Sequence, residues 1–297
     1  MRAISRRQIL LAGAASLLVP SRTSFANVKS ASAICVFTKP FNSLSFEELA
    51  DRIAELGVDG IEAPIRKGGH IEPVDVEEKL PKLVEALRQR GLEITVLTSD
   101  VNDPSDPLSV KVLKTAASVG IKRYRLKYFK YKSDRPIMKQ LNEWKPQLRE
   151  LAALNGELGI RGIYQNHAGN GYMGASLWDL RHLLRNIPKQ DLAVAYDIRH
   201  ATVEGGMSWP TTFQMIRPYV DTVYVKDFVW DAKKTRNVPL GQGYVKPIFF
   251  QMLAESGFDG PISLHEEYLD HREPSLVPQH LDAIRNDLAT LGRWLKS

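Results

Sequence analysis

The stretch LAVAYDIRHATVEGG at residues 192–206 sets the organisation of the chain. Its first four residues are apolar and predict a buried strand, which ends in a polar loop that begins near Asp197. Asp197 and His200 lie three residues apart at this point, so both side chains can reach one pocket. Glu204 and two glycines follow, which add a third polar group and a chain that bends tightly. The alternative interpretation is an Asp that caps the next helix and a His that packs at the surface.

The same alternation of a strand and a helix recurs along the chain. Strands are predicted at 33–38, 58–64, 92–98, 122–128, 160–166, 192–197, 222–227 and 262–267. Helices are predicted at 46–56, 76–90, 107–119, 137–158, 177–185, 211–216, 246–256 and 278–294. Repeated strand–helix units require parallel strands with helical crossovers, and eight of them predict an α/β fold of the (β/α)₈ TIM-barrel type. A doubly wound open sheet is the alternative, and its dinucleotide-binding form is disfavoured because no Gly-x-Gly-x-x-Gly follows the first strand.

The first residues have the pattern of an export signal. SRRQIL at 5–10 contains a twin arginine, an apolar run covers 10–19, and SFA at 24–26 is a small-x-Ala cleavage site. We therefore expect a signal peptide at 1–26, a single barrel domain at 27–297, and a periplasmic location. An uncleaved membrane anchor is the alternative, but the apolar run is too short for a permanent span.

Composition excludes some function classes. Residues 1–26 hold four arginines and no acidic residue, so their removal lowers the formal net charge from +6 to +2. The mature chain has no basic stripe that would follow a nucleic acid, and we expect no nucleic-acid partner. The single cysteine, Cys35, cannot form an intramolecular disulfide, so an exported chain must rely on its core. Homo-oligomerisation remains open.

Polar residues gather where the predicted strands end, which in a barrel is the face that carries the active site. They are Glu62, Arg125, Lys127, Gln165, Asn166, His167, Asp197, His200, Lys226, Asp227, His265, Glu266 and Glu267. Burying so many polar groups at one barrel mouth is costly unless they have partners or a ligand. The pattern therefore indicates a ligand site.

Four short motifs at these ends are YQNH at 164–167, DIRH at 197–200, VKD at 225–227 and PISLH at 261–265. With them the mature chain resembles the sugar phosphate isomerase/epimerase superfamily, or xylose isomerase-like barrels, over essentially its whole length. In that superfamily the matching stretches commonly read E-N-H, D-x-x-H, H-x-K-D and P-x-S-x-E. The first Glu, the Asp, the His and the last Glu hold a divalent metal there. This chain has Gln165, Tyr224 and His265 at three of those positions and keeps only Asp197.

The residues that remain still suggest a chemistry. Asp197, His200 and His265 could hold Mn, Zn, Co or Fe, and a metal-free hydrogen-bonded cluster is the alternative. His265 and Glu267 are predicted to move protons, and Lys226 is predicted to polarise a carbonyl or stabilise an enediolate. The alternative for each is a structural ion pair.

The other polar residues at the barrel mouth are predicted to bind substrate. Gln165 and Asn166 are neutral hydrogen-bonding groups that suit sugar hydroxyls, as does Arg125. The remaining members of this predicted set are Glu62, Lys127, His167, Glu204, Tyr224 and Asp227.

The resulting hypothesis is an exported enzyme of the isomerase/epimerase type that acts on a keto-sugar, a keto-glycoside or a cyclitol. It would remove the proton next to a carbonyl and pass through an enediolate. Elimination from the same intermediate would make it a lyase or dehydratase. A barrel that binds carbohydrate without catalysis is the alternative from another class, and a nuclease is opposed by the near-neutral charge and by export.

Overall fold

The computed structural model describes residues 32–296, and within them a parallel barrel of eight strands closes in the order β1-β10-β7-β6-β5-β4-β3-β2. The predicted signal peptide lies outside the described residues. The barrel strands are β1 Ile34–Phe37, β2 Gly60–Ile65, β3 Glu93–Ser99, β4 Arg123–Arg125, β5 Arg161–Gln165, β6 Leu192–Asp197, β7 Val220–Val225 and β10 Ile262–Leu264. The predicted TIM barrel is therefore confirmed.

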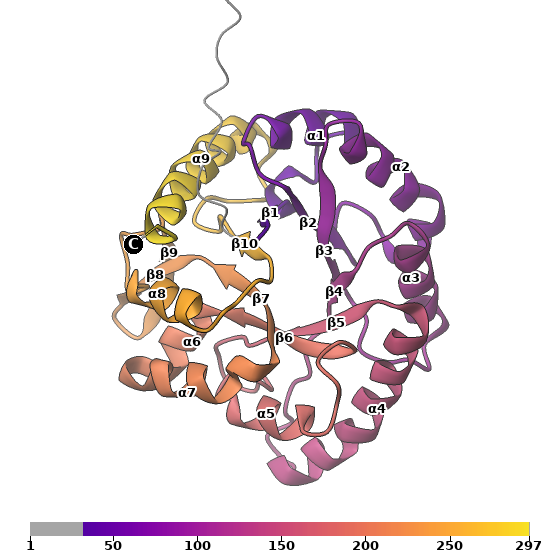
Figure 1. The fold of residues 1–297 in the computed structure, drawn as a ribbon, viewed down its shortest axis with the longest axis vertical. Coiled ribbons are helices and arrows are strands. Elements are labelled where there is room, and N and C mark those ends of the chain that lie inside the picture. Colours follow the sequence, from indigo (N-terminus) through magenta and orange to yellow (C-terminus); the bar gives the residue numbers. More distant parts are fainter. Residues whose placement is uncertain (1–31, 297) are drawn as a thin grey trace, which may run out of the picture.

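Helices surround the strands on the outside of the barrel (Figure 1). They are α1 Phe46–Ala54, α2 Val76–Arg88, α3 Pro107–Ser118, α4 Ile137–Leu158, α5 Trp178–Leu184, α6 Ile198–Gly205, α7 Trp209–Ile216, α8 Ile248–Glu255 and α9 Val277–Trp294. Short 3-10 turns at Lys39–Phe41, Pro73–Asp75, Gly206–Ser208, Arg217–Tyr219 and Pro274–Leu276 complete the described elements. No described helix is long and apolar enough to cross a membrane.

The helices begin and end for local reasons. Ser45 and Glu48 form a reciprocal capping box at α1, and the Asp106 side chain accepts hydrogen bonds from two backbone amides at the start of α3. Gly159 ends α4 in the left-handed conformation, which a residue with a Cβ adopts at a cost. Apolar side chains recur once per turn on the inner faces, and Leu49 and Ile53 of α1 are fully buried against the strands.

Two cores hold the fold. The larger one lies between the helices and the barrel, and a small one inside the barrel consists of Val96, Ile163, Ala193, Ala195 and Tyr224. Because side chains alternate along a strand, the positions opposite this inner core face the helices. The interior is thus filled below the mouth, and a cavity opens at the carboxyl ends of the strands.

Several predicted segments differ from the structure. The loop expected after β6 is the helix α6, and Asp197 caps it by accepting a hydrogen bond of 3.0 Å from the backbone amide of His200. The stretch after β7 forms an antiparallel hairpin of β8 Asp227–Asp231 and β9 Lys234–Val238. Strand β4 is also shorter than predicted.

Candidate functional site

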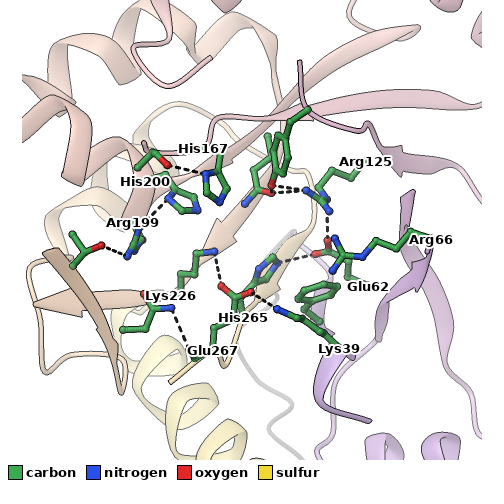
Figure 2. Close-up of a pocket in the computed structure, with 16 residues that line it drawn as sticks. Lys39, Glu62, Arg66, Arg125, His167, Arg199, His200, Lys226, His265 and Glu267 are labelled. Carbon is green, nitrogen blue, oxygen red and sulfur yellow. Dashed lines mark hydrogen bonds and ion pairs between the residues drawn. The ribbon is translucent and has the colours of Figure 1, made fainter. Parts of the chain in front are cut away.

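A cavity of about 430 Å³ opens at the carboxyl ends of the strands, and Figure 2 shows the side chains around it. Its lining residues come from β1 and β2, from the ends of β4, β5, β7 and β10, from α6 and from the β8–β9 hairpin. Eight of the residues predicted for the site line it: Glu62, Arg125, Gln165, His167, His200, Lys226, His265 and Glu267.

Glu62 and His265 form a buried pair on one side of the cavity. His265 Nε2 lies 2.8 Å from Glu62 Oε2, which also accepts a hydrogen bond of 2.8 Å from Ser263. Burial opposes ionisation of Glu62, but the neighbouring His265 outweighs it and, with Arg125 and Thr98, lowers the pKa of Glu62 to about 2. An ionised carboxylate only accepts, so His265 carries a proton on Nε2.

The free atom of His265 is therefore Nδ1, which has no hydrogen-bond partner in the part of the chain that the structure describes. Its ring is held between Phe37 and Tyr224, with centroid distances of 4.8 and 4.5 Å. A carboxylate that fixes the tautomer of an imidazole is the arrangement by which a histidine becomes a general base. The pair can thus take up a proton at Nδ1.

Arg125 and Gln165 form the next part of the wall. Arg125 Nη1 donates to Gln165 Oε1 at 3.0 Å and to the Tyr128 hydroxyl at 2.5 Å, and Tyr128 also bonds to Gln165 Oε1. Gln165 Nε2 donates to Asp197 Oδ2 at 2.8 Å. The amide thus links a cation to a buried anion, a role that a glutamate at this position could not fill without protonation.

Lys226 lies between two carboxylates. Its Nζ is 2.8 Å from Glu267 Oε2 and 3.3 Å from Asp197 Oδ2. Burial would lower the pKa of Lys226, but Asp197 and Glu267 raise it above the ordinary value. Burial would raise the pKa of Glu267, but Lys226 and then His265 hold it well below the usual range. Both groups stay charged near neutral pH, so Lys226 is a fixed positive charge in the cavity.

The rings of His167 and His200 lie against each other, with centroids 4.1 Å apart and planes tilted by 36°. Burial, with the charge of Lys226, lowers the pKa of His167 to about 4 and that of His200 well below its ordinary value. His167 Nδ1 donates to the carbonyl of Ala168 at 2.8 Å, which leaves the lone pair on Nε2. His200 Nδ1 accepts from Arg199 at 3.0 Å, so its proton is on Nε2, 3.5 Å from Asp197 Oδ2.

The three residues predicted to hold a metal do not fit one in this arrangement. Asp197 Oδ2 faces the N–H donors of Gln165 and Lys226. The Nδ1 lone pair of His200 is used by Arg199, and Nε2 of His265 is bound to Glu62. Metal ligands need free lone pairs. Within residues 32–296 no group of three or more His, Cys, Asp or Glu side chains is arranged to hold an ion.

Five predicted substrate-binding residues do not line the cavity. Asn166 pairs with the backbone of Asp197 through bonds of 2.8 and 3.1 Å, and Tyr224 is fully buried beside His265. Lys127 is exposed, and Glu204, also exposed, accepts from the amide of Gly169 at 2.8 Å. The fifth residue is Asp227. As placed, none of these five side chains lines the cavity.

Asp227 anchors the loop at residues 239–245. Its carboxylate accepts hydrogen bonds of 2.8–3.0 Å from four backbone amides, those of Phe228, Gly241, Gly243 and Val245. A Cβ at Gly243 would meet the Phe228 carbonyl oxygen at 2.2 Å, so only glycine allows this approach. All lone pairs of the carboxylate are used, which leaves none for a substrate.

Several cavity residues were not predicted. Lys39 and Arg66 follow β1 and β2, Arg199 lies at the start of α6, and Thr235 and Asn237 come from β9. Arg199 was visible inside the DIRH motif, and its Nη2 donates to Thr235 at 2.8 Å. The charge of Lys39 and Arg66 just past two strand ends was the available signal for the other cations.

The fold and the cavity define a parallel α/β barrel with a polar site at the carboxyl ends of its strands. The family model for xylose isomerase-like TIM barrels matches residues 50–288, and the chain belongs to that family. No curated protein sequence matches the chain significantly.

Solved structures share the fold at low identity. A xylose isomerase domain protein from Planctomyces limnophilus has 16% identity and a TM-score of 0.69, with 89% of this chain and 98% of that chain covered. The 3-keto-D-glucoside 4-epimerase from E. coli has 17% identity and a TM-score of 0.67, with 88% and 98% covered. The probable 3-DHS dehydratase from Bacillus anthracis has 16% identity and a TM-score of 0.63, with 86% and 99% covered.

Proposed function

We propose that this protein is an enzyme that removes the proton next to the carbonyl of a keto-sugar or keto-glycoside, and that it is an isomerase or epimerase. The observation that carries the proposal is the Glu62–His265 pair, in which a buried carboxylate orients an imidazole whose Nδ1 is free. The E. coli 3-keto-D-glucoside 4-epimerase and the D-psicose 3-epimerases among the similar structures support this substrate class.

The roles follow from the charges. His265 Nδ1 takes the proton, Glu62 stabilises the imidazolium that results, and that imidazolium returns a proton to a carbon of the enediolate. Lys226 and Arg125 are positive and lie in the wall, so they stabilise the negative charge that develops on the carbonyl oxygen. Because the low pKa of Glu267 makes it a weak base, its role is to position Lys226 rather than to move protons.

A metal bound at Asp197, His200 and His265 would require Asp197 and His200 to leave their present partners, whereas Nδ1 of His265 is free. The residues as placed do not favour this, and the proposed steps use only side chains of the chain. The positive charges of Lys226 and Arg125 supply the electrostatic stabilisation.

A second outcome of the same chemistry is elimination. When a leaving group lies β to the carbonyl, the enediolate can expel it, which would make the protein a lyase. The likeness to a probable 3-DHS dehydratase supports this outcome. Product analysis separates the two, because elimination yields a conjugated enone that absorbs in the ultraviolet whereas isomerisation does not.

The test is hydrogen exchange in D2O, followed by NMR, with a panel of ketoses and 3-keto-glycosides. We expect deuterium at the carbon next to the carbonyl for at least one compound. We also expect roughly 10²- to 10⁴-fold slower exchange for His265→Gln. His182→Gln, on the outer helix α5, is the matched control and should exchange at the wild-type rate. Binding of a keto-sugar without any exchange would favour a non-catalytic carbohydrate-binding barrel.

The proposed setting is the periplasm, on the basis of the twin arginine and the SFA site at 24–26. N-terminal sequencing of the protein recovered from that compartment should give a chain that starts near Asn27. An uncleaved N-terminus on a membrane-bound protein would contradict this proposal.

A further inference from the structure

The cavity wall carries more positive than negative charge. Its cationic side chains are Lys39, Arg66, Arg125, Arg199 and Lys226, and its carboxylates are Glu62 and Glu267. Asp197, buried beneath the wall, adds one more carboxylate. A neutral sugar gives no reason for such an excess in a half-enclosed site.

The carboxylates neutralise only part of this charge. Glu62 Oε2 is paired with His265 Nε2, and Glu62 Oε1 lies 4.0 Å from Arg125 Nε. Glu267 Oε2 lies 2.8 Å from Lys226 Nζ. Lys39 reaches Glu267 only at 4.0 Å and donates no side-chain hydrogen bond among residues 32–296.

Arg66 has neither a hydrogen bond from its guanidinium nor an ion pair in the described chain. The nearby Asp100 could have paired with it, but Asp100 Oδ2 accepts the backbone amide of Lys67 at 2.7 Å. All five N–H donors of Arg66 are therefore available.

Lys39 and Arg66 come from neighbouring elements. They follow β1 and β2, which pair in parallel with Phe37 opposite Glu62. The Arg66 guanidinium carbon is 5.9 Å from the centroid of the Phe37 ring. Figure 2 shows both side chains extending into the cavity from the same side, next to Glu62 and across from Arg199.

Neighbouring positive charges act on both Lys39 and Arg66. Burial lowers the pKa of Lys39, which Glu267 partly opposes, and the positive charge of Arg66 lowers it further. Burial lowers the pKa of Arg66 as well, followed by repulsion from Arg125. An anion placed between these cations would relieve the repulsion and fill the unused donors.

We propose that Arg66 and Lys39 form a subsite for a negatively charged group on the substrate, a carboxylate or a phosphate. This rests on the proposed function, because it names the substrate class of the same cavity as acidic keto-sugars. A guanidinium binds either anion through two parallel N–H···O bonds, and a neighbouring ammonium adds a point charge. The Phe37 ring, with its centroid 5.9 Å from the guanidinium carbon, adds a cation–π contact to Arg66.

The binding test needs no turnover. D-glucuronate, D-glucose 6-phosphate and D-glucose are titrated calorimetrically at low salt into the wild-type protein, Arg66→Gln, Arg66→Lys and the exposed control Lys122→Gln. We expect an acidic sugar to bind at least about tenfold more tightly than glucose. Arg66→Gln should remove this preference, Arg66→Lys should keep part of it, and Lys122→Gln should keep all of it. Thermal unfolding checks that each variant is folded.

The two acidic probes distinguish a carboxylate site from a phosphate site. Equal affinity for all three sugars in the wild-type protein would overturn the proposal, and so would a preference that survives in the Arg66→Gln/Lys39→Gln double variant. No binding of either acidic sugar at about 10 mM would also overturn it. The proposed function fails separately, since it is lost only if no keto-sugar, acidic or neutral, exchanges hydrogen in D2O.

Discussion

Replacing Glu62 with Gln tests whether its charge, rather than its shape, activates His265. The amide can still accept the Nε2–H of His265, and Thr98 and Ser263 can turn their hydroxyls to match it, so the geometry of the pair is kept. What is lost is the negative charge opposite the imidazolium that forms when Nδ1 takes a proton.

The size of the effect follows from the pKa of Glu62. Its fall from 4.5 to about 2 corresponds to about 3 kcal/mol in favour of the charged carboxylate, against the cost of full burial. His265 is the first of the groups that lower this pKa, so loss of the negative charge opposite its imidazolium should slow proton transfer by up to about 100-fold. The rate of deuterium incorporation in D2O is the assay, and Glu255→Gln on the outside of α8 is the matched control.

The same variant has a signature in stability. A carboxylate with a lowered folded-state pKa contributes stability that is present above pH 4.5 and is lost as the pH falls towards about 2. Glu62→Gln should therefore lower the free energy of unfolding by about 3 kcal/mol at pH 7 and by much less at pH 2. A folded Glu62→Gln protein that exchanges hydrogen within a factor of two of the wild-type rate would refute the reasoning.

Three further predictions concern the surroundings of the site. Asp227→Asn should lower the free energy of unfolding, measured by chemical denaturation, by about 2–4 kcal/mol. The reason is that one amide oxygen cannot replace two carboxylate oxygens that accept hydrogen bonds from four backbone amides. A change confined to KM would instead indicate substrate contact. Burial raises the pKa of Asp287 to about 7, so its carboxyl lowers the free energy of unfolding as the pH rises from 3.8 through about 7. Asp287→Asn should therefore raise the free energy of unfolding more at pH 8 than at pH 4, by up to about 4 kcal/mol. Equal effects at both pH values would contradict this. Dialysis against EDTA should leave both hydrogen exchange and thermal stability unchanged, because the carboxylate of Asp197 and the Nδ1 lone pair of His200 are already used by other groups of the chain. A metal-dependent loss reversed by Mn or Zn would contradict this.

The barrel could be predicted because its signals are local and repeated. Most strands contain a run of apolar residues, and the helices have a periodic apolar face. Several helices also end at or near a glycine, such as Gly159. The predicted ends of the strands also located most of the cavity, since parallel strands in a closed barrel bring their carboxyl ends to one face.

Other features depend on signals that the sequence does not carry. The β8–β9 hairpin turns at Ala232, which adopts a φ of 50° without the Asn-Gly or Gly that usually marks such a turn. The motif positions of Asn166 and Asp227 gave no sign that their side chains bond to backbone groups instead of a ligand. The hydrogen bond between His265 and Glu62 joins residues 203 positions apart, and it forms only because the barrel closes.

Different residues stabilise the barrel mouth and line its cavity: Asp227 fixes the loop at 239–245, whereas the β8–β9 hairpin contributes side chains to the cavity. The hairpin is fixed at its base, yet it places Thr235 and Asn237 at the cavity, where Asn237 Nδ2 donates to the Glu267 carbonyl at 3.2 Å. Its tip can therefore be exchanged for other sequences while the barrel stays intact. For protein engineering, replacement of residues 231–236 should alter one wall of the cavity, where Thr235 accepts a hydrogen bond from Arg199, without redesign of the barrel strands.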